Sequence, residues 1–402
     1  MKVKILKDII KKIDVLFLKK GYIPALEYIL LKDKKIIYTN MVYVLSIDFL
    51  YYTGKEVFIN FIQLKEIIKK LSNNDEIQLV NENNNFYITT FEQHYKIDIF
   101  PLKEYKKYVD LSILNSEYHD IDELINGDIG ILSTSKFFTR KADTGSIILE
   151  FVEIDNEYIV STNNLTLFFK KRKYFNKYKE KYLIDRKLIP LFNNIKKIVI
   201  SKIDFYDKDS SKEKDILYSY LKFTTINFSL YQKFQDGKFP NWKEILPDKR
   251  NELLEFTYSK KDMSISLKDI HTDYFDIVFE TQDMEEGKIR LESVNDIEED
   301  SPINKIALEA CININNQGYK DYIPLRIRFN KKLFSTYIEK CESDYINEIL
   351  YCGTNYKKDE QGLNIKDENG SYIYDSPNIA KYDITLNKLN NEFIIMPYSI
   401  NV

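Results

Sequence analysis

The 402-residue chain has few cysteines, histidines, glycines and prolines, and a single tryptophan. Its three cysteines, Cys311, Cys341 and Cys352, form no C-x-x-C pair, which argues against a disulfide framework and favours a reduced, intracellular protein. The three histidines stand far apart, with no carboxylate or cysteine at metal-ligand spacing. No phosphate-binding loop, dinucleotide fingerprint or nucleophile elbow is present. The sequence therefore predicts no cofactor and no metal site, and no motif in it points to catalysis.

A long hydrophobic run is also missing. The N-terminal segment MKVKILKDIIKKIDVLFLKKG is charged throughout, unlike a secretory signal or a membrane-spanning helix. We therefore expect a cytoplasmic protein that binds no membrane. With 44% hydrophobic residues and a net charge of −3, the chain has enough apolar material for packed cores and too little charge for disorder. Its length fits two or three domains.

Charge is distributed unevenly along the chain. Residues 2–20 hold seven lysines against two aspartates, a balance of +5, whereas residues 280–300 hold nine acids against two basic residues, a balance of −7. A mildly acidic protein with concentrated basic helices can meet a polyanion on one face while the rest stays in water.

The sequence predicts a helix over residues 4–19. Apolar residues recur at helical spacing along one side, and Lys4, Lys7 and Lys11 fall on the opposite side. Gly21 and Pro24 follow as helix stop signals. The next segment, YILLKDKKIIYTNMVYVLSIDF, alternates and breaks like a series of short strands.

Three segments repeat the order strand, polar cap, helix and strand: VFINFIQLKEIIKKLSNNDEIQLV, KYLIDRKLIPLFNNIKKIVIS and LRIRFNKKLFSTYIEKCESDYINEILY. Alignment on the cap places Gln63, Asp185 and Asn330 in register, at spacings of 122 and 145 residues. This spacing predicts three similar domains, 1–114, 115–248 and 249–402. An insertion around the acidic stretch 281–302 accounts for the longer spacing. Pro190 is expected to kink or shorten the second helix.

Each unit also opens with a predicted helix. These helices cover residues 4–19, about 121–141 and about 259–273, although the last segment alternates partly like a strand. Two helices and a strand-rich remainder in each unit predict an α+β fold.

The scarce glycine and proline residues gather with Trp242 in the segment FQDGKFPNWKEILPDKRN, residues 234–251. Its core D-G-K-F-P-N-W-K-E-I-L-P resembles the D-G-[RK]-F-P-[DN]-[YW]-x-x-[VIL]-[LI]-P segment of the bacterial sliding clamp, the β subunit of DNA polymerase III. The final strand EFIIMPYSINV resembles that family's V-x-M-P-[MV]-[RK]-L, and KKGYIPALEYILL resembles its R-x-T-[LI]-P-I-L-x-x-[IL]-L. The three motifs occur in the family's order, from near the N-terminus to the last strand, so the resemblance covers the full chain.

The resemblance implies a DNA-clamp fold, with three similar domains that each pack two helices on antiparallel sheet. Two such chains would close head to tail into a homodimer ring around double-stranded DNA. The protein would be a non-catalytic processivity factor in DNA replication, bound to DNA without sequence preference. Its partners would be the DNA polymerase III catalytic subunit and the clamp loader, which hydrolyses the ATP.

The resemblance also implies a pocket for partner peptides. Its residues would be Pro240, Glu244 and Ile245, then Ile394, Ile395, Met396, Pro397, Tyr398 and Ser399, and the turn Thr162, Asn163, Asn164, Leu165, Thr166 and Leu167. The family has T-D-G-x-R-L at that turn, so its glycine and arginine are absent here, as is its basic residue near the C-terminus. We therefore expect a changed peptide preference. Buried strand ends are the alternative role for these residues.

Basic residues on the inner helices would attract phosphates without reading bases. The candidates are Lys4, Lys7, Lys11, Lys20, Lys65, Lys69, Lys136, Arg140, Lys141, Arg186, Lys187, Lys331 and Lys332. For each one alone, an ordinary solvated surface position is the alternative.

Two other functions stay open at the level of sequence. One is a clamp-like scaffold that binds nucleic acid or replication proteins without forming a ring. The other is a nucleic-acid-processing enzyme with a metal at Asp283, Glu285 and Glu286. Because these acids lack the D-x-D-x-D-G spacing of a cation loop, a solvated hairpin is the favoured interpretation.

Overall fold

The computed structural model describes residues 1–402 except 19–22, 83–84, 109–110, 141–146, 174–179, 207–215, 235–237, 247–251, 295–304, 315–324, 342, 352, 357–373, 379–383, 388–391, 396–398 and 402. The chain folds into two compact units. Unit 1 comprises Met1–Ser133, Glu153–Glu157 and Arg172–Gly237, and unit 2 comprises Thr134–Val152, Tyr158–Lys171 and Lys238–Val402. The division into three domains remains a prediction.

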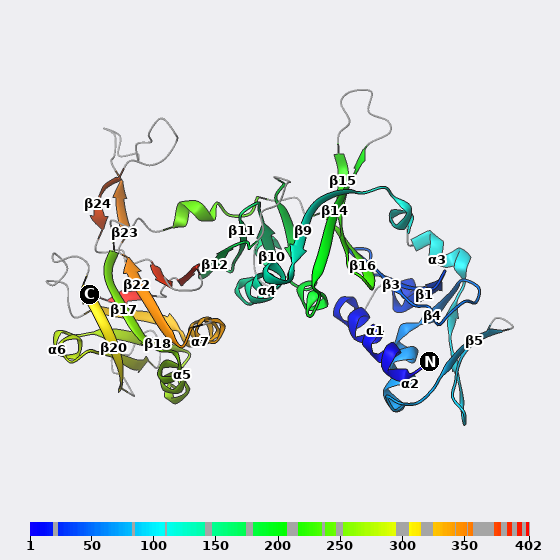
Figure 1. Ribbon diagram of the computed structural model, residues 1–402, viewed down its shortest axis with the longest axis horizontal. Coiled ribbons are helices and arrows are strands. Elements are labelled where there is room, and N and C mark those ends of the chain that lie inside the picture. Colours follow the sequence, from blue (N-terminus) through cyan, green and yellow to red (C-terminus); the bar gives the residue numbers. More distant parts are fainter. Residues whose placement is uncertain are drawn as a thin grey trace. The chain divides into compact units, whose positions relative to one another are not determined.

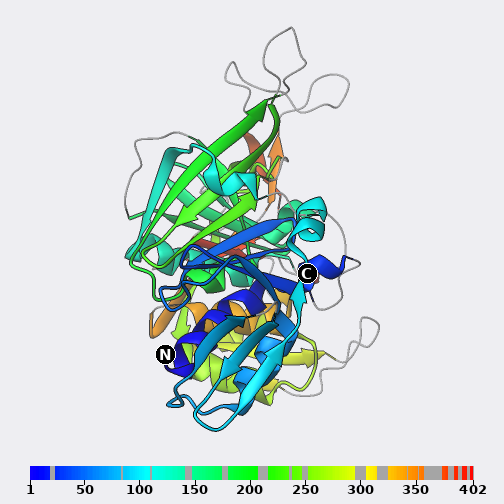
Figure 2. The ribbon, with the colours of Figure 1, turned by 90° about the vertical axis from the view of Figure 1, so that its right-hand side faces the viewer.

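Unit 1 is built on a nine-stranded antiparallel sheet with the order β8-β4-β1-β2-β3-β16-β15-β14-β9. The strands are β1 (Tyr28–Lys32), β2 (Lys35–Thr39), β3 (Tyr43–Asp48), β4 (Val57–Asn60), β8 (Ile99–Phe100), β9 (His119–Ile125), β14 (Lys197–Tyr206), β15 (Ile216–Thr224) and β16 (Phe228–Lys233). The pairing of β3 with β16, with Leu45 opposite Leu230, joins segments far apart in the sequence. The long pair β14–β15 is drawn in green in Figure 2.

The predicted series of short strands is confirmed as β1, β2 and β3. A second sheet of unit 1 has three strands, β5 (Gln78–Glu82), β6 (Asn85–Thr89) and β7 (His94–Ile97), and β13 (Tyr182–Asp185) also belongs to this unit.

The helices of unit 1 include the predicted N-terminal one. They are α1 (Val3–Leu16), α2 (Phe61–Lys70), α3 (Leu102–Tyr108) and the 3₁₀ turns η1 (Pro24–Glu27), η2 (Ser112–Asn115) and η5 (Ile189–Phe192). Helix α1 buries the apolar side that its periodicity predicts, including Leu6, Ile9 and Ile13, and it packs against α2. Figure 1 shows the two helices side by side.

Unit 2 contains a long antiparallel sheet with the order β11-β12-β26-β25-β22-β17-β20-β19-β18-β21-β27. The strands are β11 (Tyr158–Thr162), β12 (Thr166–Lys171), β17 (Glu252–Ser259), β18 (Tyr274–Phe279), β19 (Lys288–Val294), β20 (Lys305–Ile314), β21 (Leu325–Asn330), β22 (Tyr345–Tyr351), β25 (Ile384–Asn387), β26 (Glu392–Ile395) and β27 (Ser399–Asn401). Strands β23 (Gly353–Tyr356) and β24 (Tyr374–Asn378) form a separate ribbon.

The helices of unit 2 are α5 (Lys260–Asp269), α6 (Thr281–Glu285), α7 (Lys331–Lys340), η3 (Lys136–Phe138), η4 (Ile147–Glu150) and η6 (Trp242–Ile245). Helix α5 packs against α7, and Figure 1 shows this pair too. Strand β10 (Phe151–Ile154) and helix α4 (Asn126–Ser135) contribute residues to both units. None of the helices in the described part of the chain is long and apolar enough to cross a membrane.

The structure confirms one of the later predicted opening helices and corrects the start of the other. The helix predicted near residue 259 is confirmed as α5, since Met263 and Leu267 are buried on one helical face. The helix predicted from residue 121 is wrong at its start. Residues 119–125 form β9, which pairs with β14, and α4 begins only at Asn126. The α+β prediction is confirmed.

The predicted register of the helix caps is wrong in the first repeat. The side chain of Asn60 caps α2 by accepting a hydrogen bond from the backbone N–H of Gln63 at 3.0 Å, so Gln63 lies inside the helix. Asn330 caps α7 in the same way, at 3.1 Å from Leu333 N. Asn60 is therefore the counterpart of Asn330. N-cap preferences agree with Asn60 as the cap of α2, because asparagine is a better N-cap residue than glutamine.

In the middle repeat, the cap position is followed by a turn and not by an α-helix. Asp185 accepts a hydrogen bond from Lys187 N at 2.7 Å, and the chain then makes only the 3₁₀ turn η5. Pro190 lies inside that turn, where its missing N–H and its ring oppose a longer α-helix. The predicted shortening at Pro190 is confirmed.

Candidate functional site

The helix pair α1–α2 presents predicted basic residues to solvent. Lys4 and Lys11 of α1 and Lys65 and Lys69 of α2 are exposed, while the apolar sides of both helices are buried. Lys7 differs, because it is half-buried and its Nζ donates a hydrogen bond that ends on the backbone of the residue after α2. The exposed side of this helix pair is therefore rich in lysine.

Two of these lysines pair with acids on the same helices. Lys65 lies 2.6 Å from Asp14, a contact that joins α2 to α1, and Lys11 lies 3.6 Å from Asp8. Exposed ion pairs of this kind are worth about 0–1 kcal/mol. A polyanion can therefore compete for both lysines at small cost.

The remaining basic candidates lie in both units. Lys187, exposed, and Arg186, half-buried, follow β13 in unit 1. In unit 2, Lys332 is exposed at the start of α7, whereas the Nζ of Lys331 donates to the carbonyl of Ile270 after α5.

Near η3 in unit 2, basic side chains cluster around one aromatic ring. Lys136 lies 5.1 Å and Lys340 of α7 4.0 Å from the centre of the half-exposed Phe137 ring. Arg140 is half-buried just beyond, and its backbone N–H donates to Leu149. Lys20 and Lys141 lie outside the described residues.

The turn between β11 and β12 is built by asparagines where the sliding-clamp motif has aspartate and glycine. The Asn163 side-chain oxygen accepts hydrogen bonds from the backbone N–H groups of Leu165, at 2.9 Å, and Thr166, at 2.8 Å. Asn164 adopts φ +77°, a left-handed conformation that asparagine tolerates better than most residues. The sequence departs from the motif but keeps a tight turn, and it leaves Leu165 44% exposed.

Asn164 is exposed like Leu165, but the other residues of this turn are less accessible. Thr162, Thr166 and Leu167 are buried, and Asn163 is half-buried. Of the predicted pocket residues here, Leu165 is thus the one with a large exposed apolar surface.

The C-terminal segment lies beside this turn. Strand β26 pairs with β12, with Ile394 opposite Leu167 and Ile395 opposite Thr166. Ser399 is in β27, where it pairs with Arg328 of β21. Met396, Pro397 and Tyr398 lie outside the described residues. The structure therefore brings two of the three predicted pocket segments together through backbone pairing.

The third segment is anchored to the same strands by Trp242. This side chain is 3% exposed, and its ring lies 5.1 Å from that of Phe169 in β12 and 5.2 Å from that of Tyr158 in β11. Pro240 is exposed just before η6, the turn that contains Glu244 and Ile245. The lone tryptophan thus fixes the Phe-Pro segment to the strands that carry the asparagine turn.

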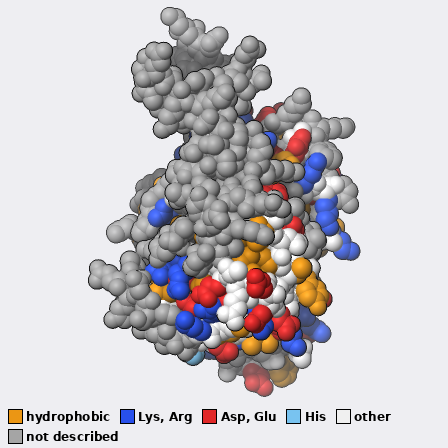
Figure 3. Space-filling view, turned by 90° about the vertical axis from the view of Figure 1, so that its left-hand side faces the viewer, with side chains coloured by type: hydrophobic (Ala, Val, Ile, Leu, Met, Phe, Trp, Pro, Cys, Tyr) orange, Lys and Arg blue, Asp and Glu red, His pale blue; other side chains and the backbone are white. Residues whose placement is uncertain are grey.

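The acidic stretch engages in ion pairs. Asp283 lies 2.5 Å from Arg290, which also pairs with Glu280 at 2.6 Å, and Glu286 lies 2.8 Å from Lys288. The described residues contain no group of three potential ligands placed for a metal ion. Figure 3 shows acidic and basic side chains intermixed on the displayed face.

The sequence did not predict the buried cluster of charged side chains in unit 1. Arg172, 4% exposed, donates to both carboxylate oxygens of Asp122 at 2.8 and 3.0 Å and lies 3.4 Å from Asp128. Tyr182 donates to Asp122 at 2.5 Å. Burial raises the pKa of Asp128, although Arg172 opposes the shift. The cluster ties β9, α4 and β13 together and contains none of the predicted site residues.

Solved structures share this fold along the whole chain. A DNA polymerase sliding clamp from Pseudomonas aeruginosa matches with a TM-score of 0.69 at 13% identity, covering 99% of this chain and 98% of that one. The DNA polymerase III β subunit of Borrelia burgdorferi, in complex with a natural product, gives 0.72 at 14% over the same shares. Caulobacter crescentus polymerase III β gives 0.70 at 13%, covering 99% of both chains. This chain has the sliding-clamp fold.

The sliding-clamp fold predicted from three short motifs is thereby confirmed. No protein-family model matches the sequence, and no curated protein matches it. The likeness to the solved sliding clamps is thus one of tertiary structure at 12–14% identity.

Proposed function

We propose that the protein is a sliding clamp: a non-catalytic homodimer that encircles duplex DNA and tethers the DNA polymerase III catalytic subunit. The observation that carries this proposal is the match to entire sliding clamps, with 98–99% of each of their chains covered. Three similar domains, 1–114, 115–248 and 249–402, would alternate around a head-to-tail ring of two chains.

The proposed ring holds DNA by topology, and its basic helices only attract phosphates. Exposed lysines such as Lys4 and Lys69 supply a charge that is independent of sequence and weakened by salt. The pairs Lys65–Asp14 and Lys11–Asp8 moderate that charge. Weak, non-directional attraction suits sliding, because a strong grip on any base or phosphate would stop it.

The proposed partner site is formed by the β11–β12 turn, β26 and the η6 segment of unit 2. The pairing of β12 with β26 and the packing of Trp242 on Phe169 support it. An apolar side chain of a partner peptide would bury area against Leu165. Because this turn carries no charge where the family motif has an aspartate and an arginine, we expect less dependence on charged peptide residues. Polymerase and clamp loader would compete for the site.

The decisive experiment tests topological retention. The protein is loaded by a clamp loader onto nicked circular DNA, separated from free protein by gel filtration in moderate salt, and the DNA is then cut once. We expect the protein to stay on the circle and to leave after the cut.

Retention that is insensitive to the cut would overturn the ring. Such a result would mean electrostatic binding, which raised salt should abolish on circle and linear DNA alike. A charge-reversed variant, Lys4→Glu with Lys69→Glu, serves as a control. It should slow loading and still remain on closed circles once loaded.

A further inference from the structure

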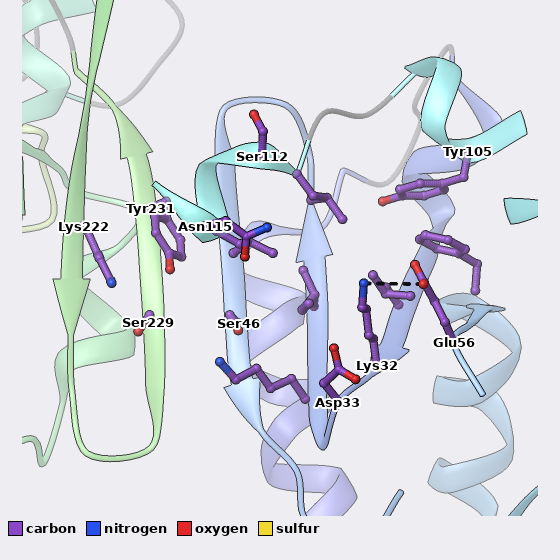
Figure 4. Close-up of a pocket in the computed structure, with 16 residues that line it drawn as sticks. Lys32, Asp33, Ser46, Glu56, Tyr105, Ser112, Asn115, Lys222, Ser229 and Tyr231 are labelled. Carbon is purple, nitrogen blue, oxygen red and sulfur yellow. Dashed lines mark ion pairs between the residues drawn. The ribbon is translucent and has the colours of Figure 1, made fainter. Parts of the chain in front are cut away.

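Unit 1 contains a pocket of 630 Å³ on its nine-stranded sheet. Strands β1, β2, β3, β4, β15 and β16 form the pocket together with α3 and η2 (Figure 4). Its volume falls in the range of ligand sites, about 300–1,000 Å³. None of the predicted DNA-binding or partner-site residues lines it.

The pocket has an apolar floor and a basic side. Leu30, Ile37, Phe58 and Tyr105 form a floor that is at most 5% exposed. The apolar lining that stays half-buried is Leu111 and Leu114 of the η2 segment. On the basic side, Lys222 lies 4.9 Å from the Tyr118 ring and 5.6 Å from the Tyr231 ring. The ammonium group of Lys222 therefore lies over these two aromatic rings in the pocket wall.

Lys35 and Lys222 both line this wall, and Asp33 lines the pocket as well. Among the described residues, neither of the two lysines lies within ion-pair distance of a carboxylate. Burial lowers the pKa of Lys222, the nearby charge of Lys35 lowers it further, and the charge of Asp120 opposes the shift. Across the pocket, Lys32 is already paired with Glu56 at 3.5 Å, as the dashed line in Figure 4 marks. An incoming anion would therefore find its free partners at Lys35 and Lys222.

The segment that covers the pocket repeats the one at the partner site. Phe-Pro occurs twice in the chain, at residues 100–101 and 239–240, and Lys-Glu follows within four residues each time. Each copy leads into a short helix, α3 or η6, that buries an aromatic side chain, Tyr105 or Trp242. The two aromatic residues stand at different distances from the proline, and the second copy buries Phe239 as well. Tyr105 stacks on Phe58 of β4 at 3.7 Å, as Trp242 packs on Phe169 of β12.

From this repeat and this cavity, we infer that the unit 1 pocket is a second peptide-docking site, which takes an acidic segment of a partner protein. An aliphatic or aromatic side chain of the peptide covers the half-buried Leu111 and Leu114. An adjacent Asp or Glu carboxylate binds between Lys35 and Lys222. The inference goes beyond the proposed clamp function and does not depend on ring closure.

The combination of basic, apolar and hydroxyl side chains in the pocket lining favours a peptide over a small free anion. A phosphate ion would reach the two lysines but leave the apolar side chains of Leu111 and Leu114 uncovered. Ser46 and Ser229 lie in the wall as hydrogen-bonding groups, and Figure 4 shows Ser229 beside Lys222. An extended peptide uses all three surfaces at once.

The test selects peptides on the full-length protein. A phage-displayed library of random hexapeptides is panned on the wild type after depletion on the double variant Lys35→Gln/Lys222→Gln. We expect enriched peptides to carry Asp or Glu next to Leu, Phe, Tyr or Trp. A fluorescein-labelled synthetic copy should lose about tenfold in affinity on the double variant, since two charge-assisted contacts disappear.

Matched variants separate this pocket from the rest of the chain. Lys96→Gln removes an exposed strand lysine outside the pocket and should leave affinity unchanged. Leu165→Asp should abolish binding at the proposed partner site and spare this one. Lys35→Gln alone, at an exposed residue, keeps the test valid if Lys222→Gln unfolds the protein.

Three results would overturn the inference. They are no enrichment of acidic peptides, equal affinity for wild type and the Lys35→Gln variant, or complete displacement of the peptide by millimolar inorganic phosphate. The last would identify a site for small anions.

Discussion

The Phe-Pro segments of the two units each precede a short helix whose aromatic side chain packs on a strand, but the residues around them differ. In unit 1, Tyr105 packs on Phe58 beside a pocket that Lys35 and Lys222 line. In unit 2, Trp242 packs on Tyr158 and Phe169, two residues of the hairpin that carries the uncharged asparagine turn at its other end. The structure contains a pocket beside the unit 1 segment, whereas the partner site beside the unit 2 segment is a proposal. The neighbouring strands and turns would give these two sites different chemistry.

The units also differ in how they hold buried carboxylates. In unit 1, the buried carboxylate of Asp122 receives two hydrogen bonds from the Arg172 guanidinium. In unit 2, Glu348 of β22 is 1% exposed and receives a hydrogen bond from Tyr258. Burial raises the pKa of Glu348 to about 7, because a phenol compensates a buried charge less well than a guanidinium does.

The largest loss of stability should come from removing the buried aromatic side chains of Trp242 and Tyr105. Trp242→Ala and Tyr105→Ala should each lower the free energy of unfolding by about 3–5 kcal/mol, as expected for deleting a large buried ring. Urea unfolding followed by far-UV circular dichroism measures both. Each change should also abolish peptide binding at its own pocket and spare the other.

Conservative variants provide the control for that comparison. Trp242→Phe and Tyr105→Phe keep a ring in place and should cost less than about 1.5 kcal/mol. If one alanine variant lowered the free energy of unfolding by less than about 1 kcal/mol, the two aromatic side chains would not anchor their segments equally.

The next effect is the pH dependence that the buried Glu348 gives to the stability of unit 2. The folded state holds the proton of Glu348 up to about pH 7, whereas the unfolded state releases it near 4.5. The contribution of Glu348 to stability is therefore full below pH 4.5, falls as pH rises, and is lost above 7. The loss amounts to about 3 kcal/mol at roughly 1.4 kcal/mol per pKa unit.

Trp242 fluorescence during urea unfolding at pH 5, 6, 7 and 8 follows this loss, because Trp242 is the chain's single tryptophan and lies in unit 2. Glu348→Gln should remove the difference between pH 5 and pH 8 that wild type shows. If the variant kept the full wild-type slope, another group would be responsible.

The smallest effect concerns the helix caps. Asn60→Ala and Asn330→Ala should each cost about 1 kcal/mol, because each leaves a helix N–H without its side-chain acceptor. Gln63→Ala, within the first turn of α2, should cost under about 0.5 kcal/mol, since its bonds to Asp98 are exposed. Thermal unfolding ranks the three. A larger cost at Gln63 than at Asn60 would restore the register expected from the sequence.

The residues of the proposed partner site were predicted from short motifs, and the structure pairs two of the three segments that carry them. The Phe-Pro-Asn-Trp segment, the asparagine turn and the last strand were each identified by local residue order. The cap register was missed because an alignment of short segments tolerates a shift of three residues, almost one helical turn. The helix expected from residue 121 began as a strand, since pairing with β14 overrides local helical periodicity.

By itself, the sequence determined the amphipathic side of α1, the strands after it, the shortened helix at Pro190 and the sliding-clamp motifs. These depend on the period of apolar residues and on the local geometry of proline and glycine. Only the tertiary structure decided that β26 pairs with β12, that Arg172 meets Asp122, and that Lys35 and Lys222 share a pocket wall. Periodicity marks which face of a segment is buried, but the partner of that face is set by packing between residues far apart in the chain.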